Sequence, residues 1–267
     1  MLNDSLIQAD ITLVITRCEE VSDSLLNSYE ALLSDDERER NNRYRFAADR
    51  RRDLIARALL RTQLGERLQM APESLVFERG EHGKPALVLD KCFVPSHYLA
   101  LKSAKHLQFN LSHSDDWVVL AIADNRIGVD IESTARKNDV MAIADRYFFG
   151  SEIEELTSFD SSEQRQRFFD YWTLKEAYMK ARGEGISLGL SKFGFSVANK
   201  PDITIEMDGC LNDSPSDWQF FCITPHPDYR LAIALNASSK PSIDCYACIP
   251  FESLVPIGDI LSLEKDE

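Results

Sequence analysis

The sequence offers no long hydrophobic run and no export signal. No window approaches the roughly 20 apolar residues that a membrane-spanning helix requires, so no membrane partner is expected. The first residues, MLNDSLI, lack the basic stretch and apolar run that open a secretory signal. A glycine-rich G-x-x-x-x-G-K-[ST] loop is also missing, which argues against a P-loop nucleotide enzyme. We therefore expect a cytoplasmic protein.

Basic residues are scarce overall, because 30 Lys and Arg stand against 44 Asp and Glu, giving a net charge of −14. Nonspecific nucleic-acid binding depends on neutralising phosphates, so no nucleic-acid partner is expected. The basic residues are nevertheless concentrated, since ten arginines fall within positions 38–67. Most of them are typical of a solvated helix face. Two or three could instead contact an anionic ligand or an acidic protein partner.

The six cysteines are scattered, and a reducing compartment makes disulfides unexpected. Cys245 and Cys248 form a lone C-x-x-C without the second ligand pair that a zinc finger needs. We interpret them as ordinary thiols.

With 267 residues, 44% of them apolar, the chain can form two lobes or one large globular domain. Alternating apolar residues predict strands, and helical spacing predicts helices. The expected elements are a strand at 10–17, a helix near 21–33, a helix opened by a capping box at Ser34–Glu37, a helix at 50–68, short strands at 75–78 and 86–89, a loop at 91–106, and a buried strand at 117–123 that returns as a hairpin through 127–132.

Two features recur at a common offset of about 113 residues. His113 and the apolar strand after it match His226 and the strand that follows, while helix 50–68 falls on residues 165–183. This predicts a duplicated α/β unit with its seam just before Gly128, where ligand sites often lie. The chain is accordingly divided into an N-terminal lobe, a C-terminal lobe and an extension without an assigned role: 1–126, 127–237 and 238–267.

The segments GVDIE (128–132) and WTLKEAYMK (172–180) carry the main candidates for chemistry. In a strand, Asp130 and Glu132 share one face while the intervening apolar residues face the core. In a helix, Glu176 and Lys180 lie one turn apart on the same face. Each pair has a plain alternative: a solvated strand end and an i,i+4 ion pair. If strand and helix pack together, three carboxylates and an ammonium converge, an arrangement suited to magnesium and a phosphate ester.

Three more residues are candidates for contacts with an anion. His113 lies in a small polar turn between two serines, Lys84 lies in the rigid turn Gly-Lys-Pro, and Arg52 begins the long helix. Structural histidine, plain turn lysine and solvated arginine remain the alternatives.

These motifs together resemble a known family. FERGEHGKPAL, FNLSHS, GVDIE and WTLKEAYMKARGEGIS, in this order and at these separations, are similar to the Sfp-type 4′-phosphopantetheinyl transferases. The resemblance covers roughly residues 34–197, with weaker similarity to about 235. It implies an α/β (α+β) fold of two pseudo-twofold related lobes with a cleft for coenzyme A between them. It also implies a monomeric, magnesium-dependent enzyme.

The implied reaction transfers the phosphopantetheine arm of coenzyme A to a serine of an apo acyl or peptidyl carrier protein and releases adenosine 3′,5′-bisphosphate. Magnesium is the implied cofactor and coenzyme A the co-substrate. By motif, the residues divide into magnesium ligands Asp130, Glu132 and Glu176, catalytic residues Glu176 (the base) and Lys180, and coenzyme A phosphate contacts Arg40, Arg52, Lys84, His113 and Lys180.

Two departures from the family are visible. Glu37 stands where some members have lysine, and the stretch between Pro85 and Phe109 is longer than in compact members. Two rival functions stay open: a non-catalytic module that binds coenzyme A or a carrier protein, and a magnesium-dependent nucleotidyl or phosphoryl transferase. The sequence does not indicate which biosynthetic pathway is served.

Overall fold

The computed structural model describes residues 9–80, 83–92, 106–197 and 202–258. Runs of helices and runs of strands follow one another along the chain, a pattern typical of α+β proteins. The helices are α1 (Asp23–Glu30), α2 (Asp35–Asn42), α3 (Ala47–Leu68), α5 (Val140–Tyr147), α6 (Gly150–Ser158) and α7 (Ser161–Arg182). The strands are β1 (Ile11–Arg17), β2 (Phe77–Arg79), β3 (Pro85–Leu87), β4 (Gln108–Ser114), β5 (Trp117–Ala123), β6 (Ile127–Ser133), β7 (Phe193–Ser196), β8 (Thr204–Met207), β9 (Trp218–Ile223), β10 (Tyr229–Asn236), β11 (Ile243–Ile249) and β12 (Ser253–Pro256).

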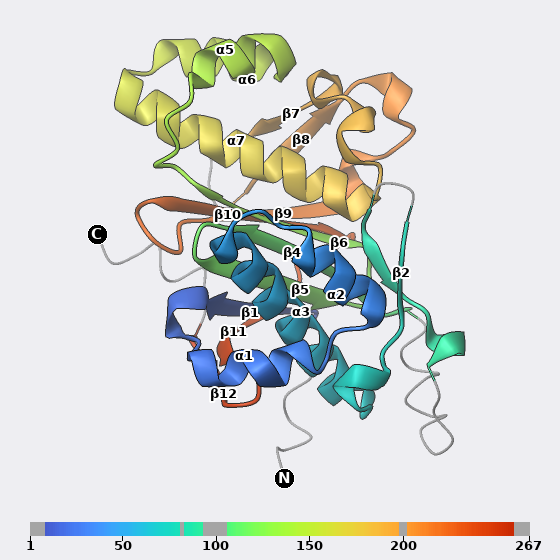
Figure 1. The fold of residues 1–267 in the computed structure, drawn as a ribbon. Coiled ribbons are helices and arrows are strands. Elements are labelled where there is room, and N and C mark those ends of the chain that lie inside the picture. The colour runs from blue at the N-terminus through green and yellow to red at the C-terminus, as the bar shows by residue number, and fades with distance from the viewer. Residues whose placement is uncertain (1–8, 81–82, 93–105, 198–201, 259–267) are drawn as a thin grey trace.

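Two main sheets pack face to face between two layers of helices (Figure 1). One sheet has the order β12-β11-β1-β5-β4, and the other has the order β6-β10-β9. Their facing sides share one apolar core, which includes Leu13, Val119, Val129 and Ile233. Helices α1 and α3 cover the outer face of the first sheet, and α5 to α7 cover the outer face of the second. Each sheet thus buries both of its faces, as its near-continuous apolar strands require.

The second half of the chain repeats the first. The hairpin of β4 and β5 pairs with β1, and the hairpin of β9 and β10 pairs with β6 in the same way. Strands β1 and β6 each have seven residues, and helices α3 and α7 each have 22. The two-stranded ribbon of β2 and β3 likewise recurs as β7 and β8. The duplicated α/β unit predicted from the 113-residue offset is therefore confirmed.

One prediction about this region was wrong. Residues 127–132 do not return as a hairpin onto β5, because β6 pairs with β10, joining Asp130 to Ala232 in register. The reason is the duplication itself, since β6 opens the second unit just as β1 opens the first. Apolar alternation identifies a strand but not its partner.

The other predicted elements are found with shifted ends. The capping box is confirmed, with Ser34 Oγ accepting from the Glu37 amide and Glu37 returning to the Ser34 amide. The long helix begins at Ala47, three residues before the predicted start. The predicted loop at 91–106 lies largely outside the described residues. No helix in the described ranges is long and apolar enough to cross a membrane.

Side chains of β4 join the two sheets along one edge. Asn110 Oδ1, Ser112 Oγ and Ser114 Oγ accept hydrogen bonds from the backbone amides of Val129, Ile131 and Ser133, at 2.9, 3.2 and 3.0 Å. These acceptors are alternate residues of a strand, so they point the same way. We call them the β4 ladder. It replaces the backbone pairing that β6 lacks on this side and fixes the position of the acidic strand.

The residues after 237, to which the sequence assigned no role, complete the first sheet. Strand β11 runs parallel to β1, with Ile243 opposite Ile11, and β12 extends the sheet beyond it. Cys245 and Cys248 lie on β11 and are buried on opposite faces of the sheet. The three-unit division of the chain stays a prediction.

Candidate functional site

Strand β6 and helix α7 lie in direct contact, and this contact brings Lys180 onto Asp130. A side chain at Gly128 would place its Cβ 1.9 Å from the carbonyl oxygen of Ala177, so only glycine allows the helix to lie this close. Lys180 Nζ donates to Asp130 Oδ1 at 2.6 Å and to Ser112 Oγ at 3.0 Å. Ser112 in turn donates to Asp130 Oδ1 at 2.9 Å. Lys180 therefore forms its ion pair across the strand, not along its helix with Glu176.

Glu132 lies two residues further along the same face of β6. It accepts a hydrogen bond from Trp172 Nε1 at 3.2 Å and forms an ion pair with Arg136 at 2.8 Å. Burial, and then the negative charge of Asp130, raise the pKa of Glu132 to about 7. The two carboxylates thus interact with each other, and each also has a cationic partner: Lys180 for Asp130 and Arg136 for Glu132.

Glu176 is half-buried on the side of α7 that faces β6. Burial is the main cause that raises its pKa, and Asp130 adds to the effect while Lys180 opposes it. A carboxyl group whose pKa is raised by burial and by a like charge is a better proton acceptor than a solvated one. Asp130 therefore interacts electrostatically with both Glu132 and Glu176.

The carboxylates fit a divalent cation in their chemistry. Asp130 Oδ2 is buried and accepts no hydrogen bond from the described residues, and Glu132 Oε2 has only its ion pair with Arg136 Nη1 at 2.8 Å. Buried anionic oxygens without donors are costly, and a hard cation would satisfy them. However, no group of three or more His, Cys, Asp or Glu side chains within the described ranges is close enough to hold a metal. The magnesium assignment therefore remains a prediction.

His113 and Arg52 form a second group of side chains near Lys180, apart from the carboxylates. Arg52 Nη1 donates to the carbonyl of Asp115 at 2.9 Å, which holds its guanidinium against the turn after β4. His113 alternates with the β4 ladder and points outward from it. Packing around its ring lowers the pKa of His113, and the positive charges of Arg52 and Lys180 lower it further. Three of the predicted phosphate contacts, Arg52, His113 and Lys180, are therefore brought together.

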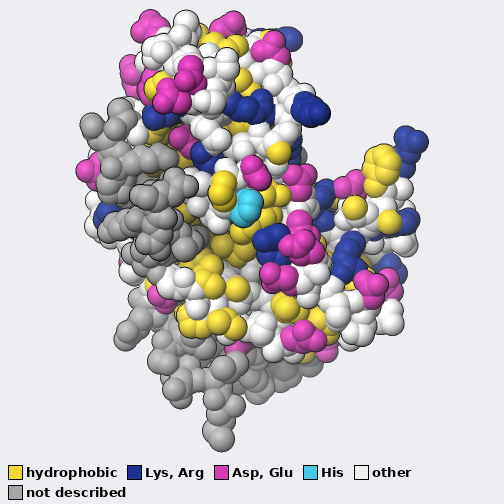
Figure 2. All heavy atoms as spheres, turned by 90° about the vertical axis from the view of Figure 1, so that its left-hand side faces the viewer, with side chains coloured by type: hydrophobic (Ala, Val, Ile, Leu, Met, Phe, Trp, Pro, Cys, Tyr) yellow, Lys and Arg dark blue, Asp and Glu magenta, His cyan; other side chains and the backbone are white. Residues whose placement is uncertain are grey.

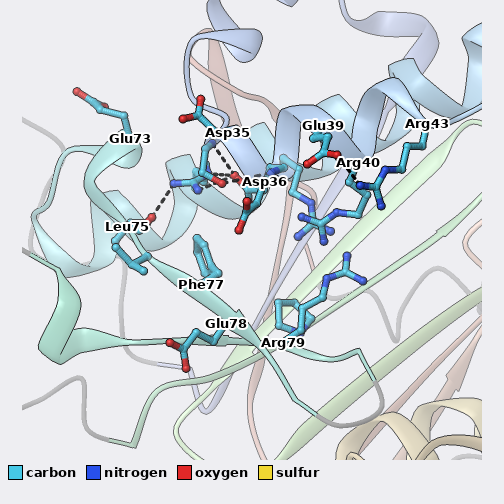
Figure 3. Close-up of a pocket in the computed structure, with 16 residues that line it drawn as sticks. Asp35, Asp36, Glu39, Arg40, Arg43, Glu73, Leu75, Phe77, Glu78 and Arg79 are labelled. Carbon is cyan, nitrogen blue, oxygen red and sulfur yellow. Dashed lines mark hydrogen bonds and ion pairs between the residues drawn. The ribbon is translucent and has the colours of Figure 1, made fainter.

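Arg40 lies in a separate groove of about 870 Å³ between α2, α3 and β2 (Figure 3). Arg79 points from β2 toward Arg40, and Arg57 enters from α3. Partial burial lowers the pKa of Arg79, and Arg40 and Arg57 lower it further. Arg57 Nε is buried without a hydrogen-bond partner among the described residues and lies 3.7 Å from Asp53 Oδ1. The arginine groove, defined by Arg40, Arg57 and Arg79, thus offers three guanidinium groups to an anion, although carboxylates line it as well: Asp35, Asp36, Glu37, Glu39, Glu73 and Glu78.

The arginine groove and the His113 group are linked through Asp53. The negative charge of this carboxylate partly offsets the lowering of the pKa of both Arg79 and His113. Glu37, the departure noted in the sequence, is buried and accepts from Arg61 Nε at 3.0 Å and Nη2 at 2.6 Å. Its charge is therefore offset by Arg61 and does not neutralise the groove.

Lys84 is placed differently from the other predicted contacts. Its ammonium donates to the backbone carbonyls of Lys180 at 2.9 Å and Ile127 at 3.2 Å. Burial, and then the positive charge of Arg126, lower the pKa of Lys84 to about 8. The sequence predicted a phosphate contact, whereas these two hydrogen bonds join the β2–β3 hairpin to the second lobe.

Three residues of the site were missed from the sequence: Ser112, Arg57 and Arg79. Ser112 was noted only as a small neighbour of His113, although alternation placed it on the opposite face. Arg57 was one of ten clustered arginines, and Arg79 became relevant only when β2 folded back over α2. Figure 2 shows one face of the molecule, on which a histidine, basic and acidic side chains lie beside apolar ones.

Comparisons with known proteins match both halves of the chain. Residues 126–234 match the family described as 4′-phosphopantetheinyl transferase superfamily, and residues 21–125 match 4′-phosphopantetheinyl transferase, N-terminal. The chain is 34% identical over 191 residues to 4′-phosphopantetheinyl transferase psf-1 of Bacillus pumilus, covering 72% of this chain and 73% of the relative. It is 29% identical over 203 residues to 4′-phosphopantetheinyl transferase Sfp of Bacillus subtilis strain 168, covering 76% and 82%.

Among solved structures, the chain is similar to holo-[acyl-carrier-protein] synthase of Thermotoga maritima, with a TM-score of 0.34 and 17% identity over 43% of this chain and 64% of that one. The assignment rests on the sequence matches, which confirm the family, the fold class and the enzyme predicted from the motifs. This chain belongs to the 4′-phosphopantetheinyl transferase superfamily and is an Sfp-type enzyme of that family.

Proposed function

We propose that this enzyme transfers the 4′-phosphopantetheine arm of coenzyme A to a serine of an apo acyl or peptidyl carrier protein, with adenosine 3′,5′-bisphosphate as the leaving product. The observation that carries the proposal is the Lys180–Asp130–Ser112 centre, with Glu132 and Glu176 beside it. The carboxylates of this centre could hold a metal ion and accept a proton. The ammonium of Lys180 could stabilise a phosphate. The cationic side chains form two groups, one around Lys180 and one in the arginine groove. Two such groups suit coenzyme A, which carries a diphosphate and a separate 3′-phosphate.

Glu176 is the proposed base for the carrier serine, directly or through a water molecule. Its raised pKa favours proton uptake when the hydroxyl attacks phosphorus. Lys180 would stabilise negative charge on the transferring phosphate, and its bonds to Asp130 and Ser112 hold it in place beforehand. Positioned charges of this kind need no rearrangement during the reaction.

Asp130, Glu132 and Glu176 are the residues that would hold magnesium, and the buried Asp130 Oδ2, which accepts no hydrogen bond from the described residues, supports this assignment. Bound magnesium would neutralise negative charge on the pyrophosphate oxygens of coenzyme A.

Coenzyme A would contact both groups of cations. Arg52, His113 and Lys180 are proposed phosphate contacts from the family motifs, and the first two lie beside Lys180 in the structure. We place the 3′-phosphate in the arginine groove, where Arg40 lies with Arg57 and Arg79. The family resemblance implies a monomeric enzyme, and we propose that state here. The cytoplasmic location remains a prediction from the sequence.

The function is tested by incubating the protein with coenzyme A, magnesium and a panel of apo carrier proteins. We expect at least one carrier to gain the mass of one phosphopantetheine group, and the nucleotide product to be adenosine 3′,5′-bisphosphate. A protein that binds coenzyme A but modifies no carrier would favour the non-catalytic module. Competition by ATP for the same site would favour the nucleotidyl transferase.

Arg79→Met should weaken coenzyme A binding about tenfold and leave dephospho-coenzyme A binding unchanged. A lost charge-assisted hydrogen bond to a phosphate costs about 1.5–3 kcal/mol. Calorimetric titration of both ligands, without magnesium, measures this difference. Arg50→Met is the matched control, because Arg50 is exposed on the same arginine-rich segment. Equal weakening for both ligands would place the 3′-phosphate outside the arginine groove.

Asp130→Asn should remove the effect of magnesium on coenzyme A affinity. The wild-type protein is expected to bind coenzyme A more tightly with magnesium than with a chelator, because the metal would join its acidic side chains to the pyrophosphate. Asparagine keeps the shape but lacks the charge. Asp145→Asn, at an exposed position on α5, is the control. A variant at position 130 whose affinity still rises with magnesium would contradict the ligand assignment.

A further inference from the structure

Lys84 connects the first lobe to the two elements that carry the catalytic centre. It lies at the start of the β2–β3 return, after Gly83, whose φ of +82° allows the tight turn. From there its ammonium reaches the carbonyl of Lys180 near the end of α7 and the carbonyl of Ile127 at the start of β6. The side chain also lines a cavity of about 400 Å³ with Leu87, Phe109 and Ala181.

The Lys180 carbonyl belongs to the last turn of α7. The helix ends at Arg182, with Gly183 in the left-handed conformation and its amide bonded to the carbonyl of Met179. The last four carbonyls of a helix have no acceptor role within it, and cations are favoured at this negative end. The Lys84 ammonium supplies both a donor and a positive charge, so it acts as a side-chain cap from another lobe.

Both ends of Lys180 are therefore held. Its side chain donates to Asp130 and Ser112, while its backbone carbonyl accepts from Lys84. Gly128 leaves no side chain between β6 and α7, so the helix backbone rests directly on the strand. A shift at the end of α7 would move the Lys180 ammonium relative to Asp130, because the helix backbone and the strand are in direct contact.

We propose that Lys84 is a positioning residue that caps α7 and fastens it to the start of β6, so that Lys180 stays over Asp130. This role differs from the phosphate contact implied by the family motif. Two of the three ammonium hydrogens are directed at backbone carbonyls, and Arg126 is the charged neighbour that acts on it. The effect on turnover rests on the proposed function, whereas the cap itself does not.

The test compares Lys84→Met with Lys91→Met, which removes the same charge from an exposed ion pair with Glu78. Amide hydrogen exchange of the ligand-free proteins measures how often the end of α7 opens, and it requires no substrate. We expect exchange in the last turn of α7 and in β6 to be about tenfold faster in Lys84→Met alone. We also expect its kcat to fall about tenfold or more, with the dissociation constant of coenzyme A changed less than about threefold.

Lys84→Gln keeps an amide donor without the charge, so it provides the test if Lys84→Met does not fold. In Lys84→Gln, amide exchange in the last turn of α7 and in β6 should be faster than in the wild type and slower than in a variant without a donor at position 84. Unchanged exchange with coenzyme A binding weakened about tenfold would overturn the proposal in favour of a phosphate contact. Unchanged exchange and unchanged kinetics would also overturn it. If the wild-type protein transfers nothing to any carrier, the proposed function fails while the exchange result still decides the cap.

Discussion

Glu176→Gln is expected to lower turnover about 100-fold or more while the dissociation constant of coenzyme A, measured without magnesium, changes less than about threefold. Glutamine has the same size and can still accept a hydrogen bond, but it cannot take up a proton at neutral pH. A group that acts on the attacking hydroxyl contributes in the transition state and little to the binding of the first substrate. Transfer to an apo carrier under saturating coenzyme A measures the effect.

The surroundings of Glu176 explain why a large loss of turnover is expected from Glu176→Gln. Burial and the charge of Asp130 both raise its pKa, so the side chain combines a higher proton affinity with a fixed place on α7. The loss of a general base typically costs about 10²–10⁴-fold. The contribution of Glu176 to a metal site would add to this loss when magnesium is present.

Glu163→Gln is the control for this substitution, because Glu163 is exposed in the first turn of the same helix. Its turnover should equal that of the wild type. Unchanged turnover in Glu176→Gln would remove the residue from the reaction. A parallel rise in the dissociation constant of coenzyme A would instead make it a binding residue.

Lys175→Met is expected to destabilise the fold by about 3–5 kcal/mol, because it leaves a buried carboxylate without its cation. Lys175 and Glu152 are both fully buried, and Lys175 Nζ lies 2.9 Å from Glu152 Oε2. Lys175 also donates to the carbonyls of Leu190 and Phe193. Its ammonium lies 4.5 Å from the centroid of the Phe193 ring. Unfolding in urea, followed by circular dichroism, measures the loss.

Glu152 shows why the pair matters to several elements at once. It accepts from the amide of Phe149, at the start of α6, and from the amide of Phe195, in β7. A carboxylate with these bonds stays in place when Lys175 is removed, so its charge becomes uncompensated. The double variant Glu152→Gln/Lys175→Met should recover part of the lost stability, because no buried charge remains.

Lys91→Met serves as the control here, since its ion pair with Glu78 is solvent-exposed and should contribute less than about 1 kcal/mol. A double variant as unstable as the sum of its two single variants would show that the two side chains act independently. In that case the buried pair would not explain the loss.

Much of the fold was predictable because it depends on local patterns. Apolar alternation identified β6, the capping box identified the start of α2, and the 113-residue offset identified the duplication. The partner of β6 could not be predicted, since alternation is the same whichever strand lies alongside. It follows from the repeat only after β1 and β6 are recognised as equivalent.

The site was predictable to the extent that neighbouring positions share a face. Asp130 and Glu132 lie together for that reason, and packing of α7 on β6 adds Glu176 and Lys180. Spacing along the helix favoured a pair between Glu176 and Lys180, whereas Lys180 reaches Asp130 across the strand. Arg57 and Arg79 were not predictable, because the return of β2 over α2 depends on contacts between segments distant in the sequence.

The pairing of β1 with β11 has a consequence for synthesis of the chain. The first strand lies between β5 and a strand whose residues follow it by 232 positions, as in the pairing of Ile11 with Ile243. During translation the backbone groups on that side of β1 lack their partner until the chain has been made as far as β11. An apolar strand with an open edge is prone to pair with other chains. The last strands therefore protect the first, and folding of the N-terminal half is completed only when the C-terminal half is present.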